Sequence, residues 1–237
     1  MLPWSMPEDF AETLTRTDWQ MAPGERAAIT GLLALARPEV AIELGAAQGG
    51  SLRQIAARSG HVHSFDLAPA VVDPPDNVTL HAGDSHVLLP QVLSELHESE
   101  TAVGFALVDG DHSPAGVRQD LEDLIDAAAV RRAYIVVHDT MNEGILAGLR
   151  AIDFARRAKI SSVDLAFVQL RQSATGIAER WGGLGLVVVD DRTYRDVRSA
   201  TMRTVAGVPA GREAVWQAFA PARSIARRVR YRRSGRA

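Results

Sequence analysis

Short apolar runs alternate along the chain with longer amphipathic segments. Seven of these runs are expected to be strands: Val40–Leu44, Val62–Phe65, Val78–His81, Phe105–Val108, Tyr134–Val137, Leu165–Leu170 and Leu184–Val189. The first five show little polar alternation, which is typical of strands covered on both faces. Helices are expected around them, over Glu25–Ala36, Ser51–Arg58, Val87–Leu96 and Gly116–Ala129. This alternation predicts βαβ units and a parallel sheet.

The fold class that follows is α/β, a doubly wound, mostly parallel sheet of seven strands in one domain. We expect the last two strands to pair antiparallel at one edge, because a longer segment, 171–183, joins them. The chain then divides into an irregular N-terminal cap (1–24), a main domain (25–190) and a helical or frayed tail (191–237). Sheets of this kind bind ligands beyond the carboxyl ends of their strands, so candidate functional residues are those that follow each strand.

Composition narrows the class of protein. The 237 residues are 46% hydrophobic and 23% charged, as in ordinary soluble proteins, and there is no cysteine for a disulfide, a thiolate metal site or a nucleophile. No apolar run approaches the roughly 18–20 residues of a membrane span. Acidic residues at Glu8 and Asp9 stand where a signal peptide would be basic and then apolar. We therefore expect a cytoplasmic protein with no membrane span.

The charge is unevenly distributed. The net charge is −3, yet the last sixteen positions, 222–237, carry seven arginines and no acid follows Glu213. The acidic remainder argues against nucleic acid as the main partner, since phosphate binding needs a broad basic face. The tail is read as a solvated end, with contact to an anionic surface as the alternative. A homo-oligomer is left open.

A glycine-rich loop follows the first strand. Gly45, Gly49 and Gly50 give the spacing G-x-x-x-G-G, which departs from the dinucleotide pattern G-x-G-x-x-G, and the loop lacks the lysine of a P-loop. Glu43 at the end of the strand suits a cationic ligand better than a phosphate. Ser51 is placed as a helix cap. A tight turn without a ligand is the structural alternative.

Two further acidic positions follow the second and third strands. Asp66 comes 21 positions after Gly45, where an acid grips ribose hydroxyls in nucleotide-binding sheets. Asp84 and Ser85 follow the third strand, where they either cap the next helix or contact a purine edge.

The densest polar clusters follow the fourth and fifth strands. They read Asp109-Gly110-Asp111-His112-Ser113 and His138-Asp139-Thr140. Adjacent parallel strands would bring Asp109, His138 and Asp139 to one rim, and carboxylate and imidazole ligands suit a divalent cation such as Mg or Mn. In the alternative reading Asp111 and Asp139 are helix caps and His112 is a loop residue.

Taken together, these segments resemble a known family. Glu43–Ser51, Asp66, Gly83–Ser85, Val108–Ser113 and His138–Thr140, in this order and spacing, are similar to class I S-adenosylmethionine-dependent methyltransferases. Within that superfamily they look most like the bacterial small-molecule O-methyltransferase group related to macrocin O-methyltransferase and cephalosporin-hydroxylase-like proteins. The resemblance covers about residues 25–190 and implies a Rossmann-like methyltransferase fold. Its most specific part is Val108–Ser113.

The resemblance assigns roles by position. It implies that S-adenosyl-L-methionine is bound by Glu43, Gly45, Ala46, Gly49 and Ser51 at its methionine and ribose end, by Asp66 at the ribose hydroxyls, by Gly83, Asp84 and Ser85 at the adenine, and by Asp109 beside the sulfonium. It implies metal ligands at Asp109, His138 and Asp139. His138 replaces the acid of metal-dependent relatives and supplies less charge, so a softer ion or no metal are alternatives.

The implied reaction is in-line methyl transfer to a hydroxyl of a small-molecule acceptor, a sugar or natural-product precursor. His112 is the candidate base, and His138 is the rival if it binds no metal; in the alternative reading either histidine only orients a carboxylate. Aromatic residues that could line the acceptor pocket, or belong to the core, are Trp4, Trp19, Phe167 and Trp181. Two other functions stay open: a nicotinamide-dependent oxidoreductase, and a non-catalytic cofactor-binding partner protein.

Overall fold

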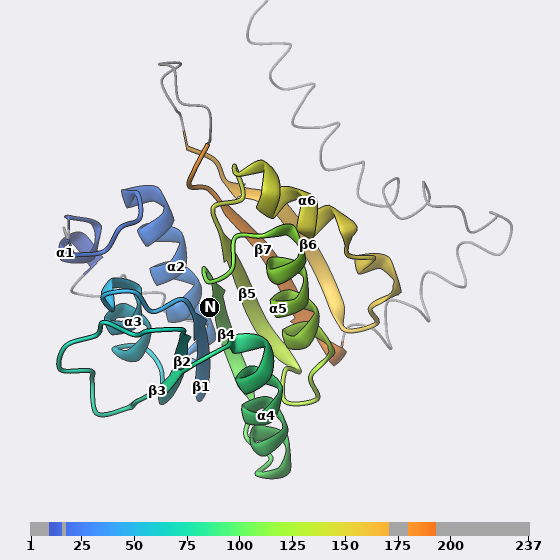
Figure 1. Ribbon diagram of the computed structural model, residues 1–237, viewed down its shortest axis with the longest axis horizontal. Helices are drawn as coiled ribbons and strands as arrows, with labels where there is room; N and C mark the ends of the chain where they lie inside the picture. The colour runs from blue at the N-terminus through green and yellow to red at the C-terminus, as the bar shows by residue number, and fades with distance from the viewer. Residues whose placement is uncertain (1–9, 16–17, 171–179, 193–237) are drawn as a thin grey trace, which may run out of the picture. The chain divides into compact units, whose positions relative to one another are not determined.

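A single seven-stranded sheet organises the protein. The computed structural model describes residues 10–15, 18–170 and 180–192. The strands lie in the order β3-β2-β1-β4-β5-β7-β6 (Figure 1). Their bounds are β1 Val40–Leu44, β2 His61–Asp66, β3 Val78–Ala82, β4 Val103–Val108, β5 Arg132–His138, β6 Ile160–Val168 and β7 Leu184–Asp190. The predicted fold class is confirmed, although β6 begins before the expected Leu165.

Strand pairing locates the ligand-binding crevice. β1 pairs in parallel with β2 on one side and with β4 on the other, and the parallel pairing extends to β3 and β5. The strand order therefore reverses between β1 and β4, which is where doubly wound sheets bind ligands. β7 runs antiparallel to both β5 and β6, as expected for the last two strands.

Helices cover both faces of the sheet. Their bounds are α1 Phe10–Thr15, α2 Pro23–Ala36, α3 Gly50–Ala56, α4 Ser85–Glu98, α5 Pro114–Asp126, α6 Glu143–Ala151 and the short 3-10 helix η1 Phe154–Arg156. The expectation of an irregular segment over 1–24 is wrong for α1 and for the first residues of α2. Sequence reasoning also missed α6. Most of the expected basic tail, 193–237, lies outside the described residues.

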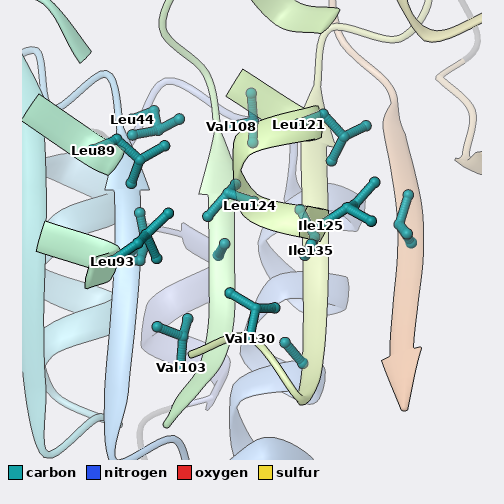
Figure 2. Packing of buried hydrophobic residues seen from close by; sticks show 14 of the residues in the cluster. Leu44, Leu89, Leu93, Val103, Val108, Leu121, Leu124, Ile125, Val130 and Ile135 are labelled. Atoms are coloured by element: carbon teal, nitrogen blue, oxygen red, sulfur yellow. The ribbon is translucent and has the colours of Figure 1, made fainter. Parts of the chain in front are cut away.

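The core forms on both faces because successive strand residues point in opposite directions. Val40, Ile42 and Leu44 pack in the cluster under α4, α5 and α6, while Ala41 packs with α2 and α3. Figure 2 shows leucines of α4 and α5 lying over the strands, and each fully buried leucine contributes roughly 1.5–3 kcal/mol. This packing holds the carboxyl ends of β1, β4 and β5 in fixed register.

The helix caps differ from expectation in two places. The cap of α3 is Gly49, with φ 83°, and not Ser51, which lies inside the helix. The cap of α5 is Ser113, whose hydroxyl accepts from the Gly116 amide at 3.0 Å, and not Asp111. Asp84 caps α4 by accepting from the His86 amide at 3.0 Å, as the structural alternative proposed.

Among the helices in the described ranges, none combines the length and apolar character that crossing a membrane requires.

Candidate active site

A large cavity opens at the carboxyl ends of the parallel strands. Its volume is about 1020 Å³. The loops after β1, β2 and β3 line one part of it, with Gly45, Ala47, Phe65, Asp66, Leu67, Gly83, Asp84, Ser85 and His86. The ends of β4 and β5, α2 and the segment before β7 line the other part, with Glu25, Asp109, Asp111, His112, His138, Asp139, Trp181 and Gly182. The cavity therefore lies where the sheet topology predicts a ligand site.

The predicted cofactor residues are divided between this cavity and its surroundings. Those that line it are Gly45, Asp66, Gly83, Asp84, Ser85 and Asp109. Ala46 and Ser51 line an adjoining cavity of about 80 Å³, and Glu43 and Gly49 line neither. Because Glu43 lines neither cavity, its position does not support the direct cofactor contact expected of it.

Gly45 is required by the close approach of two loops. Its φ is +93°, and a Cβ atom there would lie 2.2 Å from the backbone oxygen of Asp109. Its amide donates to the Phe65 carbonyl at 2.8 Å. The residue thus fixes the distance between the glycine loop and the loop after β4.

Asp66 holds the glycine loop and faces the cavity. Its Oδ2 accepts from the Ala47 amide and its Oδ1 from the Ala68 amide, each at 2.9 Å. A carboxylate has about four acceptor positions, so both oxygens can still accept from ligand hydroxyls. Ser85 is less free to bind a ligand than Asp66, because its hydroxyl donates to the buried Asp120 at 3.1 Å. Its side chain is thus engaged with α5 as well as lining the cavity.

Glu43 lies behind the glycine loop. It is fully buried, and it accepts hydrogen bonds from the hydroxyls of Ser51 at 2.6 Å and Ser64 at 2.7 Å. Burial raises its pKa to about 7, against the opposing effect of the two serine hydrogen bonds. Glu43 therefore connects β1, β2 and α3 beneath the cavity.

A cluster of histidines and carboxylates forms at the ends of β4 and β5. Val108 pairs with Val137, so the residues that follow, Asp109 and His138, are neighbours. His138 Nδ1 lies 3.0 Å from Asp109 Oδ1 and 3.4 Å from Asp139 Oδ2. His112 Nε2 lies 3.4 Å from the same Asp109 oxygen and 3.5 Å from Asp139 Oδ2. The structure thus brings the three predicted metal ligands together with His112, the predicted base.

Glu25 completes the cluster and was missed by the sequence reasoning. Its side chain is 1% exposed, and Oε1 lies 3.4 Å from His138 Nε2. The carboxylate also accepts from the amides of Ala22 at 2.7 Å and Gly183 at 2.5 Å. In the sequence Glu25 is recognisable only as an acid in the first turn of a predicted helix. An acid there ordinarily stabilises the helix end, so nothing pointed to the site.

Asp139 is held in a left-handed conformation, with φ 56°. Its Oδ1 accepts from the Gly182 amide, so Oδ2 is the oxygen that faces the histidines. Outside glycine this backbone conformation is uncommon, and aspartate is among the residues that adopt it most readily. Asn142, and not Asp139, caps α6, which leaves the Asp139 carboxylate facing the histidines.

The charges of the cluster stabilise one another. Burial lowers the pKa of His138, but hydrogen bonds to Asp109 and Glu25 and the charges of Asp109 and Asp139 outweigh it and raise that pKa to about 10. The hydrogen bond to Asp109 raises the pKa of His112, with burial opposing it. Burial raises the pKa of Asp109, but its hydrogen bonds to both histidines give a net lowering.

Three residues of this cluster, Asp109, His138 and Asp139, fit a divalent cation. One ligand atom from each of Asp109, His138 and Asp139 can be chosen so that all lie within 4.8 Å of one another. Two carboxylates and one imidazole suit Mn or a similar divalent ion, with open positions toward the cavity. Ligation through Nδ1 would replace the hydrogen bond that His138 now makes with Asp109.

Of the three aromatic candidates in the described residues, Trp181 alone lines the large cavity. Trp181 lines it and lies edge-on to His112, with ring centroids 5.5 Å apart. Trp19 is 2% exposed and belongs to the core, beside the smaller cavity. Phe167 is 36% exposed and is not among the lining residues, and Trp4 lies outside the described residues.

Comparison with known proteins agrees with this geometry. Residues 42–140 match a family model described as a methyltransferase domain. The matched segment runs from the middle of β1 to just past β5 and includes every predicted cofactor and metal residue. A search of the curated proteins finds no significant match.

Solved structures, two of them described as methyltransferases, share the fold. MycE methyltransferase from the mycinamycin biosynthetic pathway, in complex with Mg, SAH and mycinamycin VI, is similar with a TM-score of 0.52 at 12% identity, over 86% of this chain and 56% of that one. Cofactor-bound Rv0187 from MTB gives a TM-score of 0.52 at 15% identity, over 76% and 86%. A candidate O-methyltransferase from Klebsiella pneumoniae gives 0.50 at 18% identity, over 80% and 92%. At these identities the likeness establishes the fold.

Proposed function

We propose that this protein transfers a methyl group from S-adenosylmethionine to a hydroxyl of a small molecule, within a catalytic domain spanning 25–190. The observation that supports this most directly is the composition of the large cavity. Loops suited to a nucleoside line one part, and the cluster of Asp109, His112, His138 and Asp139 lines the other. Such a cavity can hold donor and acceptor end to end, which is the main requirement of an in-line displacement.

The nucleoside part of the cofactor is assigned to the loops after β1, β2 and β3. Asp66 would accept from the ribose hydroxyls, as acids at this position do in nucleotide-binding sheets. The exposed Leu67 offers apolar surface to the adenine, and Asp84 is available to its amino group. Asp109 would lie beside the sulfonium, where a negative carboxylate is favourable.

His112 is assigned as the base. Its side chain is 39% exposed and lines the cavity, whereas the side chain of His138 is 9% exposed and is enclosed by Glu25, Asp109 and Asp139. During transfer the acceptor oxygen forms a bond to the methyl carbon as the carbon–sulfur bond breaks. The sulfur keeps that electron pair, and neutral His112 takes the hydroxyl proton. His138 orients the carboxylates.

A divalent cation bound by Asp109, His138 and Asp139 would lower the pKa of the acceptor hydroxyl by direct contact. The solved structure of MycE with Mg supports this part of the proposal at the level of the fold.

Calorimetry with S-adenosylhomocysteine tests the cofactor site. We expect binding by the full chain and a loss of at least about tenfold in Asp66→Ala, since each lost charge-assisted hydrogen bond is worth about 1.5–3 kcal/mol. Asp76→Ala, an exposed acid in the loop between β2 and β3, is the matched control and keeps the affinity. No binding at high micromolar ligand, with binding of NADH instead, would favour an oxidoreductase.

Transfer itself is tested with methyl-labelled cofactor and a metabolite extract of the producing organism, with mass identification of the product. A labelled ether in the product supports O-methylation, and a labelled amine or thioether contradicts it. Normal cofactor binding without transfer to any component points to a non-catalytic binding protein.

A further inference from the structure

No step of the proposed reaction uses His86 or the buried carboxylate behind it. His86 is the second residue of α4, and it lines the large cavity beside Asp84. The carboxylate belongs to Asp120, which is completely buried on α5, the helix packed against α4. The adenine of the cofactor is assigned to this part of the cavity, so the role inferred here for His86 rests on the proposed function.

The two ring nitrogens of His86 face different carboxylates. Nε2 is buried and lies 3.3 Å from Oδ1 of Asp120, an oxygen that also accepts from the Ser85 hydroxyl at 3.1 Å. Nδ1 lies 3.5 Å from Oδ1 of Asp84, whose side chain is 58% exposed. One nitrogen thus faces the interior between α4 and α5, and the other faces an exposed carboxylate that lines the cavity.

The buried carboxylate decides which nitrogen of the ring carries the proton. Burial raises the pKa of Asp120 to about 6, although the charge of His86 and the hydrogen bond from Ser85 act to lower it. Asp120 is therefore an ionised acceptor at neutral pH. Its charge acts in the protein interior, whereas water screens the charge of the exposed Asp84, so a single ring proton is held on Nε2. Nδ1 is then a bare acceptor.

Acceptor atoms of Asp84 and His86 therefore lie side by side and call for a donor. Asp84 Oδ1 already accepts from the His86 amide at 3.0 Å, which leaves Oδ2 and His86 Nδ1 for a ligand. The amino group of adenine has two N–H bonds and can donate one to each. We propose that His86 determines specificity for adenine by accepting, together with Asp84, from this amino group. Asp120 is the positioning residue that fixes the tautomer of His86.

Calorimetry with two ligands that differ in one group tests the specificity. S-inosylhomocysteine has an oxygen where S-adenosylhomocysteine has the amino group. We expect the full chain to bind the adenine compound at least about tenfold more tightly, because the oxygen donates no hydrogen bond and meets two other acceptors. His86→Phe keeps a ring but removes the acceptor, and should reduce this preference at least about threefold. His97→Phe, at an exposed position of the same helix, is the matched control and keeps the preference.

Asp120→Asn separates positioning from a merely structural role. The amide has the same size but is a weaker acceptor than the carboxylate of Asp84, so the ring proton moves to Nδ1, which then donates. The preference for the adenine compound should fall as in His86→Phe, while the affinity for the hypoxanthine compound is kept or rises. Asp76→Asn, an exposed acid between β2 and β3, is the control. Equal weakening of both ligands by Asp120→Asn would overturn the role assigned to Asp120.

Ring nitrogen resonances of His86 in the labelled wild type give a readout that does not depend on the variants folding. Nε2 should carry the proton, and S-adenosylhomocysteine should shift the resonance of Nδ1. The proposal is overturned if Nδ1 carries the proton, if the wild type binds both ligands equally, or if His86→Phe keeps the preference. Equal binding of both ligands leaves the proposed function standing, whereas binding of neither refutes the proposed function and this role of His86 with it.

Discussion

Replacing Glu43 with glutamine tests the effect of a buried carboxyl group on stability. Glu43 is fully buried at the end of β1, and burial raises its pKa from 4.5 to about 7 despite two serine hydrogen bonds that act to lower it. Between about pH 4.5 and 7 the folded protein therefore holds a proton that the unfolded chain has lost. Stability must fall as the pH rises through this window, because the folded state binds more protons than the unfolded state.

The size of the effect follows from the pKa difference. One pKa unit corresponds to about 1.4 kcal/mol, so the ionised Glu43 costs the folded state about 3 kcal/mol above pH 7. Glutamine has the same size, carries no charge and can still bond to both serine hydroxyls. Relative to the wild type, Glu43→Gln should therefore gain about 3 kcal/mol of unfolding free energy between about pH 4 and pH 8.

Urea unfolding at several pH values, followed by tryptophan fluorescence, to which the buried Trp19 contributes, measures this difference. Glu39→Gln, at an exposed position just before the same strand, is the control and should show no pH-dependent gain. If the stability difference between Glu43→Gln and the wild type stays constant from pH 4 to pH 8, the buried carboxyl titrates normally and the reasoning from burial is wrong.

Three other changes probe the site and its support. Gly45→Ala should lose about 1–3 kcal/mol of stability in thermal melts and should weaken cofactor binding, because φ is +93° and the new methyl would lie 2.2 Å from the Asp109 backbone oxygen. Gly31→Ala is the control. A Cβ there would have nothing within 4 Å, so this variant should be neutral or stabilising in the same melts. Ser113→Ala should lose about 1 kcal/mol in urea unfolding by removing the cap of α5, and Ser113→Asp should restore most of it. Glu25→Gln should lower the pKa of His138 in metal-free protein, because the change removes a carboxylate charge 3.4 Å from His138 Nε2. An NMR titration of the His138 ring with the same midpoint as in the wild type would contradict this contact.

The sequence predicts the sheet and one rim of the site well, for a simple physical reason. Parallel strands end at the same edge, so polar residues after β4 and β5 must be neighbours once the strands pair. Asp109 and His138 follow from this rule without any knowledge of side-chain conformation. The same rule places Asp66 and Gly83 at the cavity.

Other parts of the site depend on contacts that no local pattern encodes. Glu25 reaches His138 from the first turn of α2 and accepts from Gly183, 158 positions later in the chain. Glu43 occupies a strand end like the other candidates, yet its side chain points into the core. Strand alternation decides which way a residue faces, and that depends on register and not on residue type.

The late strand β7 has a consequence for biosynthesis. Gly182 and Gly183, at its entrance, donate to Asp139 and Glu25. The Asp139 carboxylate therefore gains this backbone partner, and Glu25 the second of its two, only when β7 has been added beside β5. A chain still on the ribosome, with β1 to β5 already made, would carry every residue of the glycine loop, but its histidine–carboxylate cluster would be incomplete. In newly made protein this cluster would thus be completed in one late step, after the segment around position 183 has emerged from the ribosome and packed beside β5.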